Sequence, residues 1–113
     1  MAAETQVTLS AEDAKLLALA KTAAARVGAP GGASVRDEDG RSYTAADVNL
    51  PSLKLSALQL AVAQAVAAGA TGLEAALVVA TEADAAGVAA VRDVSSSAPI
   101  YLVAGDAITK VAA

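Results

Sequence analysis

Apolar residues recur at helical spacing in the first third of the chain. They run from Leu16 to Val27 and predict a helix over residues 11–27. Ser10 stands just before this segment and is expected to cap its first turn, because a serine oxygen can accept a hydrogen bond from a free backbone N–H. Gly28 follows and predicts the helix end, since glycine readily adopts the left-handed conformation found there.

The pattern changes to short strands after a glycine-rich turn. We expect strands over residues 33–37 and 41–48, which flank Glu38-Asp39-Gly40. The Asp-Gly pair favours a hairpin between them. Further along, the uninterrupted apolar run Ala76–Ala80 predicts a strand over residues 73–81 that is covered on both faces.

Two more helices are predicted on either side of that strand. The first spans residues 53–68, begins after the turn at residues 49–52 and ends at Gly69. It is apolar nearly all round, so we expect it to be buried centrally in the domain or in an oligomer. The second is rich in alanine and spans residues 84–94.

The chain ends with two predicted strands, residues 100–104 and 107–111, joined by Gly105-Asp106. The element order is therefore α-β-β-α-β-α-β-β. Such an order predicts an α/β fold in which helices cover a single mixed sheet of about five strands. We expect one domain over residues 10–113, preceded by a flexible N-terminal tail over residues 1–9.

Composition narrows the possible chemistry. The chain of 113 residues contains no cysteine and no histidine, which supply most zinc ligands, thiol nucleophiles and neutral-pH general bases. Its formal net charge is −4, and its 8 basic residues are scattered, so we expect no nucleic-acid binding. No apolar stretch reaches the length of a membrane span. Without cysteine, and with no signal peptide evident, we expect a cytoplasmic protein that does not bind a membrane.

Four segments carry a resemblance to a known family. They are Gly32–Tyr43, Asp47–Asn49, Ser56–Val66 and Val88–Val94. Together they resemble the small, homo-oligomeric cytidine deaminases, in which the matching segments are the first hairpin, an Asn-x-Glu nucleoside-binding segment, a helix start Cys-Ala-Glu-Arg, and Cys-x-x-Cys-Arg-Gln-Val. The resemblance implies the three-layer α/β/α sandwich of that family, with Ser56 and Val88 32 positions apart as its arrangement requires.

The resemblance also implies a degenerate zinc site. Ser56, Val88 and Val91 stand where the family has its three zinc ligands, and Leu58 stands where it has the glutamate that shuttles protons. A deaminase needs the metal to activate water and the glutamate to move protons. We therefore expect no metal, no cofactor and no zinc-dependent deamination, and we expect apolar side chains to fill the former metal centre.

Two further positions correspond to the family's nucleoside contacts. Asp47 and Asn49 replace its Asn and Glu, and Asn49 can both donate and accept hydrogen bonds to a sugar. The alternative is structural, in which the two residues end a strand and form a turn before Pro51.

An acidic cluster, Asp37-Glu38-Asp39, offers carboxylates to a hard cation such as calcium, but hairpin tips of this kind are usually just solvated.

Three functional hypotheses follow. The first is a catalytically inactive pseudoenzyme of the cytidine deaminase type, kept as a structural or protein-interaction module. The resemblance implies that it forms a homo-oligomer, a dimer or tetramer, and an unknown protein partner belongs to the same hypothesis. The second is a nucleoside or nucleotide sensor without chemistry. The third is a residual or unrelated metal-free enzyme.

Overall fold

The computed structural model describes residues 4–81 and 84–111 of the chain. Its elements follow one another in this order: β1 (Glu4–Gln6), α1 (Ala11–Val27), β2 (Gly32–Asp37), β3 (Ser42–Ala46), β4 (Val48–Leu50), β5 (Leu53–Leu55), α2 (Ala57–Ala67), β6 (Leu73–Val79), α3 (Ala85–Val94), β7 (Ile100–Ala104) and β8 (Ala107–Val111).

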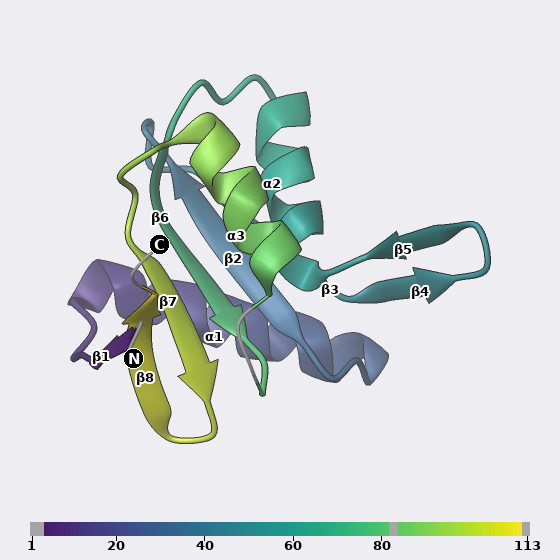
Figure 1. Ribbon diagram of the computed structural model, residues 1–113, viewed down its shortest axis with the longest axis horizontal. Coiled ribbons are helices and arrows are strands. Elements are labelled where there is room, and N and C mark those ends of the chain that lie inside the picture. Colours follow the sequence, from purple (N-terminus) through teal and green to yellow (C-terminus); the bar gives the residue numbers. More distant parts are fainter. Residues whose placement is uncertain (1–3, 82–83, 112–113) are drawn as a thin grey trace.

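Six strands form one mixed sheet in the order β1-β8-β7-β6-β2-β3 (Figure 1). All neighbours are antiparallel except β6 and β7, which are parallel and connected through α3. β4 and β5 pair only with each other and form a separate ribbon. The last strand, predicted at residues 107–111, is present as β8.

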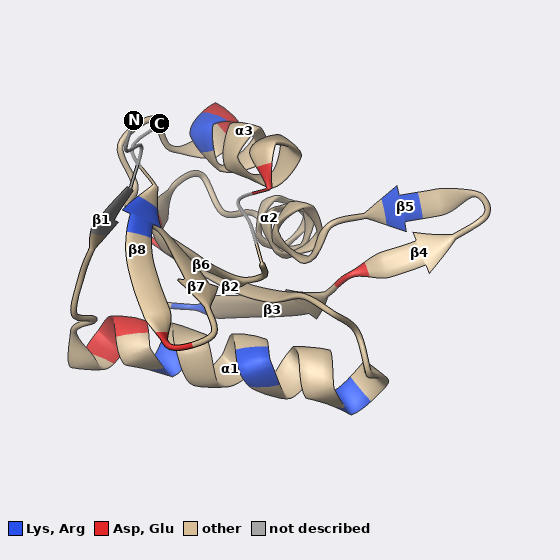
Figure 2. Cartoon of the chain, turned by 60° about the horizontal axis from the view of Figure 1, so that its bottom comes forward, with Lys and Arg blue, Asp and Glu red and all other residues tan. Residues whose placement is uncertain are grey.

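The sheet is covered on both faces. α1 lies along one face, and α2 and α3 lie on the other (Figure 2). Under α1 the core is small and includes Leu16, Ala20 and Leu77. The larger core lies between the sheet and the α2–α3 layer. The predicted three-layer α/β/α sandwich is therefore confirmed.

The ends of α1 are those that the sequence predicts. Ser10 Oγ accepts a hydrogen bond from Asp13 N at 3.1 Å, and this bond satisfies one of the free N–H groups of the first turn. Gly28 has a φ of 67°, a left-handed conformation that glycine adopts at little cost, and its N–H bonds back to the last turn.

The flexible tail expected over residues 1–9 is wrong at Glu4–Gln6, while residues 1–3 lie outside the described part. Glu4–Gln6 form β1, which pairs antiparallel with β8, and Val7 N donates to Ile108 O at 2.9 Å. The physical reason is the open edge of β8, whose unpaired backbone groups accept another strand. The sheet thus has one strand more than the five expected.

The helix predicted over residues 53–68 is wrong in its first turn, because it begins only at Ala57. Residues Val48–Leu50 and Leu53–Leu55 form the β4–β5 ribbon instead, so the strand expected over residues 41–48 is also split at Asp47. Apolar and polar residues alternate on both sides of Pro51-Ser52, which is the period of strands.

α2 buries one side rather than its whole circumference within a single chain. Leu58, Ala61 and Ala65 are fully buried, whereas Val66 is 50% exposed. Among the residues that the structure describes, no helix is both long enough and apolar enough to cross a membrane.

Candidate functional site

The four positions identified with the family's catalytic centre lie on two neighbouring helices. Ser56 is the N-cap of α2, and Leu58 lies in the first turn of that helix. Val88 and Val91 lie on α3, which packs against α2 (Figure 1). The fold therefore brings two segments together that are far apart in the sequence.

The start of α2 is closed by side chains from the chain itself. Ser56 Oγ accepts from Gln59 N at 3.1 Å, and Gln59 Oε1 accepts from Ser56 N at 3.0 Å, which completes a capping box. Asp47 Oδ1 accepts from Ala57 N at 2.8 Å. The free N–H groups that begin a helix are thus partly satisfied here by Ser56 and Asp47.

Leu58, Val88 and Val91 belong to one buried cluster between α2, α3 and the sheet. Leu58 and Val91 are 0% exposed and Val88 is 8% exposed. Gly87 lies directly against Leu58, since a Cβ added at Gly87 would stand 2.7 Å from Leu58 Cβ. Aliphatic side chains therefore fill this part of the molecule at close contact.

Asp84 lies beside this cluster, since its Oδ2 and Leu58 Cβ are both close to Gly87. It is the N-cap of α3, but its side chain makes no capping hydrogen bond. Its Oδ2 is buried and has no hydrogen-bond partner among the described residues, and it lies against Gly87. Within residues 4–81 and 84–111, no group of three His, Cys, Asp or Glu side chains is arranged to hold a metal ion.

Asp47 and Asn49 lie where β3 passes into the ribbon. Asp47 connects β3 to β4 and also lies against Gly31. Asn49 is inside β4, and its Oδ1 accepts from Lys54 Nζ at 3.3 Å. Both side chains thus take part in structural contacts, although Asn49 lies in a strand rather than in the turn considered from the sequence.

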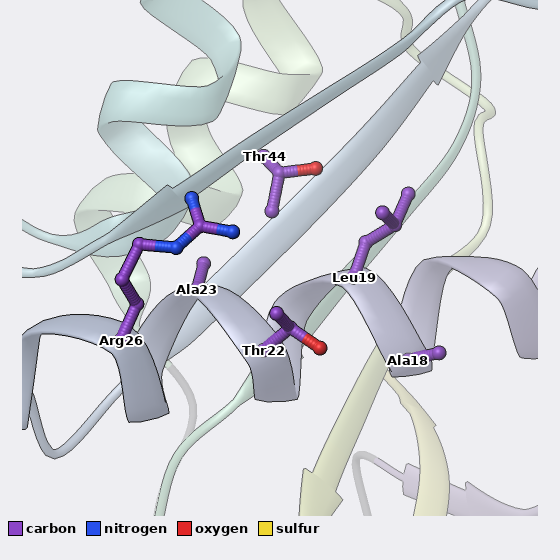
Figure 3. A pocket seen from close by; sticks show the side chains of 6 residues that line it. All are labelled: Ala18, Leu19, Thr22, Ala23, Arg26 and Thr44. Carbon is purple, nitrogen blue, oxygen red and sulfur yellow. The ribbon is translucent and has the colours of Figure 1, made fainter.

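The same two residues line a surface hollow of about 500 Å³ between the end of α1, β3, β4 and α2. Its other lining residues include Arg26, Val27, Ala46, Leu50, Leu60 and Gln64. A second hollow of about 270 Å³ adjoins it between α1 and β3. There Arg26 extends from α1 toward β3, which contributes Thr44 (Figure 3).

A family model of cytidine deaminase-like proteins matches residues 9–107. The chain belongs to this family. This match confirms the family that the sequence resemblance predicts.

Solved structures show the same cytidine deaminase-like fold. A cytidine deaminase from Burkholderia pseudomallei matches with a TM-score of 0.77 and 21% identity over 92% of this chain and 94% of that one. A cytidine deaminase from Mycobacterium leprae matches with a TM-score of 0.62 and 18% identity over 82% of this chain and 90% of that one. No curated protein sequence matches the chain.

No local sequence pattern predicts one polar cluster of this cytidine deaminase-like chain. Arg36 on β2 donates to Asp13 Oδ1 on α1 at 2.9 Å and to Glu74 Oε1 on β6 at 2.8 Å. The hydroxyl of Tyr101 on β7 donates to Asp13 Oδ2 at 3.0 Å. The four residues come from four elements, so only the tertiary fold unites them, and they hold α1 against the sheet.

Burial and hydrogen bonds in this cluster determine which of its groups are charged. Burial on its own would lower the pKa of Arg36, but the hydrogen bonds to Glu74 and Asp13 raise it above its ordinary value. Burial raises the pKa of Tyr101, and the hydrogen bond to the Asp13 carboxylate raises it further. Arg36 therefore stays charged and Tyr101 stays neutral at physiological pH.

Two carboxylates of the acidic hairpin tip, those of Asp37 and Glu38, accept hydrogen bonds from other groups of the chain. Asp37 is 1% exposed, and its Oδ1 accepts from Asp39 N at 2.9 Å and from Arg41 N at 3.0 Å, while its Oδ2 accepts from the Tyr43 hydroxyl at 2.8 Å. Glu38 accepts from Gly72 N at 2.8 Å. These bonds give Asp37 and Glu38 a structural role in the hairpin. Asp37 is buried, whereas Glu38 and Asp39 are exposed, so the expectation of solvated carboxylates fails only at Asp37.

Proposed function

We propose that this chain is a catalytically inactive member of the cytidine deaminase-like family that serves as a structural or protein-interaction module. The observation that carries the proposal is the aliphatic cluster of Leu58, Val88 and Val91. By family resemblance these positions would hold the proton-shuttling glutamate and two zinc ligands. Here they are leucine and valine, packed into the core.

The donor set does not fit a zinc ion. Protein zinc is bound by thiolate, imidazole or carboxylate groups. Val88 and Val91 have no lone pair, and the hydroxyl of Ser56 already accepts a hydrogen bond from Gln59 N. The chain contains no cysteine or histidine to replace them. Water activation by zinc therefore has no support at this position.

We further propose that the module self-associates. Several large apolar side chains are about half exposed in the single chain, including Leu50 at 54%, Leu53 at 49% and Val66 at 50%. Apolar patches of this kind commonly mark interaction sites. A cytoplasmic location, fitting the cysteine-free sequence, is part of the same proposal.

A turnover assay tests the loss of activity. The purified chain is incubated with cytidine, with and without added zinc, and uridine is measured beside an active cytidine deaminase as positive control. We expect no uridine above the protein-free background. Turnover that disappears in a folded Ser56→Ala variant would contradict the proposal.

A nucleoside sensor is the second candidate, favoured by the hollow that Asp47 and Asn49 line. Thermal unfolding with cytidine, uridine and their nucleotides separates the two functions, because a ligand that binds only the folded state raises the midpoint. The module proposal predicts no rise. A rise that Asn49→Ala removes would establish the sensor instead.

A further inference from the structure

The strand β3 forms one margin of the six-stranded sheet. It pairs with β2 on its inner side, and among the residues that the structure describes no strand lies on its outer side. Its register with β2 is regular from Ser42 to Ala46, so no bulge bends it. The strand also contains no proline and no charged residue. Bulges, prolines and charges are the usual protection of an open strand edge, so the outer edge of β3 is free to accept another strand.

Hydrogen bonds at the two ends of β3 show which of its backbone groups face β2. Asp37 N donates to Arg41 O at 2.8 Å before the strand, and Asp47 N donates to Gly31 O at 3.2 Å after it. The direction of the backbone groups alternates along a strand. The odd-numbered residues from 41 to 47 therefore face β2.

The even-numbered residues of β3 are the ones whose backbone groups face outward. They are Ser42, Thr44 and Ala46, and both the N–H and the C=O of each point away from β2. A further strand would satisfy these groups by pairing with them.

Two surface hollows meet along this edge. The hollow of about 270 Å³ and the hollow of about 500 Å³ share Ala23, Arg26 and Thr44 as lining residues. The larger hollow is lined both by α1 and by α2, which lie on opposite faces of the sheet (Figure 2). Helices from both faces can meet around one hollow only at the margin of a sheet, so the two hollows form a trough beside β3, which we call the edge trough.

The two walls of the edge trough differ in chemistry. The α2 wall presents Leu60 and Gln64, both half-buried. The α1 wall presents Leu19, Thr22 and the exposed Arg26 (Figure 3). One wall is therefore mainly aliphatic and the other carries a cation.

Arg26 is the charged group that an occupant of the edge trough would meet. Within residues 4–81 and 84–111 it has no ion pair and no side-chain hydrogen bond. Asp47, the other charged residue of the lining, already accepts from Ala57 N. The trough thus favours an occupant with an acidic group near Arg26.

We propose that the edge trough binds an extended peptide segment of another protein, which adds to the sheet as a strand beside β3. The peptide backbone pairs with the outward groups of Ser42, Thr44 and Ala46. Its side chains alternate between the walls, with aliphatic ones toward α2 and polar ones toward α1, including an acidic residue at Arg26. This assignment rests on the proposed role as a protein-interaction module and names the surface and the class of partner.

Titration with a defined peptide is the first test. The probe is Ser-Val-Glu-Val-Thr-Val-Ser with acetylated and amidated ends, followed by NMR of the native chain. We expect it to shift the amide signals of Ser42, Thr44 and Ala46 and to slow their exchange with solvent. No binding at about 1 mM peptide, or shifts confined to other elements, would overturn the proposal.

Two methylated forms of the peptide test the backbone pairing. One is methylated on its valine nitrogens and the other on its glutamate and threonine nitrogens, so each has lost the donors of a different edge. An added strand uses only one of its edges, so we expect one form to bind at least about tenfold more weakly and the other to bind like the parent peptide. Equal binding of the two forms contradicts strand addition.

Variants of the α1 wall test the place of the side chains. Arg26→Glu is expected to weaken binding about threefold to tenfold, while Lys110→Glu, the same charge change on β8 near the other margin of the sheet, leaves it unchanged. Ala23→Phe fills the trough where the hollows meet and is expected to weaken binding at least about tenfold. Ala25→Phe, an exposed change on α1 outside the trough, is the matched control. With folding checked by circular dichroism, equal effects of a variant and its control would overturn the assignment.

Sedimentation velocity distinguishes the peptide from a second copy of β3 at the same edge. We expect any association of the native chain to be unchanged by the peptide and by Ala23→Phe. A native dimer that both dissociate would overturn the peptide assignment in favour of a second copy.

The outcomes separate this inference from the proposed function. Failure of the peptide to bind overturns the edge-trough assignment alone, because it leaves the loss of deamination untouched. Uridine formation in the turnover assay overturns the inactive module whether or not the peptide binds.

Discussion

Asp37 determines the geometry of the β2–β3 turn through three hydrogen bonds to a single carboxylate. Burial on its own would raise its pKa, but the bonds from the Tyr43 hydroxyl and from the N–H groups of Arg41 and Asp39 lower it below the ordinary value of 3.8. A group whose pKa falls on folding stabilises the folded state when it is ionised. The Asp–Gly signal predicts the turn, but it does not reveal that this aspartate is buried.

Asp37→Asn is therefore expected to destabilise the fold in a pH-dependent way. The contribution of Asp37 is fully present above the ordinary aspartate pKa and is lost as the pH falls through the lower, folded value. Urea unfolding of both proteins measures this, with a clear deficit of the variant at about pH 7 that narrows toward about pH 2. Asp39→Asn, an exposed change in the same turn, is the control. A deficit independent of pH would contradict the role of the carboxylate charge.

Asp13 is the residue on which the polar cluster under α1 depends. Asp13→Ala leaves the Arg36 guanidinium, 14% exposed, without one of its two carboxylates, and the Tyr101 hydroxyl without its acceptor. Breaking one partner of a buried pair is costly, so we expect a loss of about 3 kcal/mol in the free energy of unfolding. Glu12→Ala is the control, since its ion pair with Lys15 is exposed and worth less than about 0.5 kcal/mol. Equal effects of the two changes in chemical denaturation would show that the cluster is not important for stability.

At the scale of elements, Ser56 at the start of α2 is the residue that the resemblance matches to a zinc ligand, and it also caps the helix. Ser56 and Gln59 satisfy each other's backbone N–H groups, and Asp47 accepts from Ala57 N. The sequence predicts α1 to within a residue because its caps and its apolar period agree. It fails at residues 53–55, because an alternation of only three residues is too short to be told from the start of the apolar helix that follows, and only the ribbon pairing decides between them.

Ser56→Ala tests the structural role. It removes the acceptor for Gln59 N, and we expect a loss of about 1 kcal/mol in the free energy of unfolding, as for other N-cap serines. Ser52→Ala, an exposed serine in the ribbon turn, is the matched control and is expected to have almost no effect. Thermal or urea unfolding gives the difference. An unaltered stability in Ser56→Ala would mean that the cap contributes nothing.

At the scale of the whole molecule, the fold is that of the cytidine deaminase-like family. The positions that the sequence resemblance matches to the catalytic centre of that family meet where α2 and α3 pack together. The sequence predicts the layers and the meeting of these positions through the resemblance. It does not predict the added strand β1 or the Arg36 cluster, because both depend on long-range pairing between segments without a local pattern. Our central proposal is that the scaffold persists while the positions matched to the catalytic centre have become core and cap.

Restoration of the ligands tests that claim most directly. The triple variant Ser56→Cys, Val88→Cys and Val91→Cys places thiols at the three family positions, and cobalt and zinc binding are measured after dialysis, beside the native chain. We expect the native chain to retain no metal and the folded variant to retain a single ion per chain, with thiolate-to-cobalt absorption. Tight metal binding by the native chain, or none by the folded variant, would contradict the account.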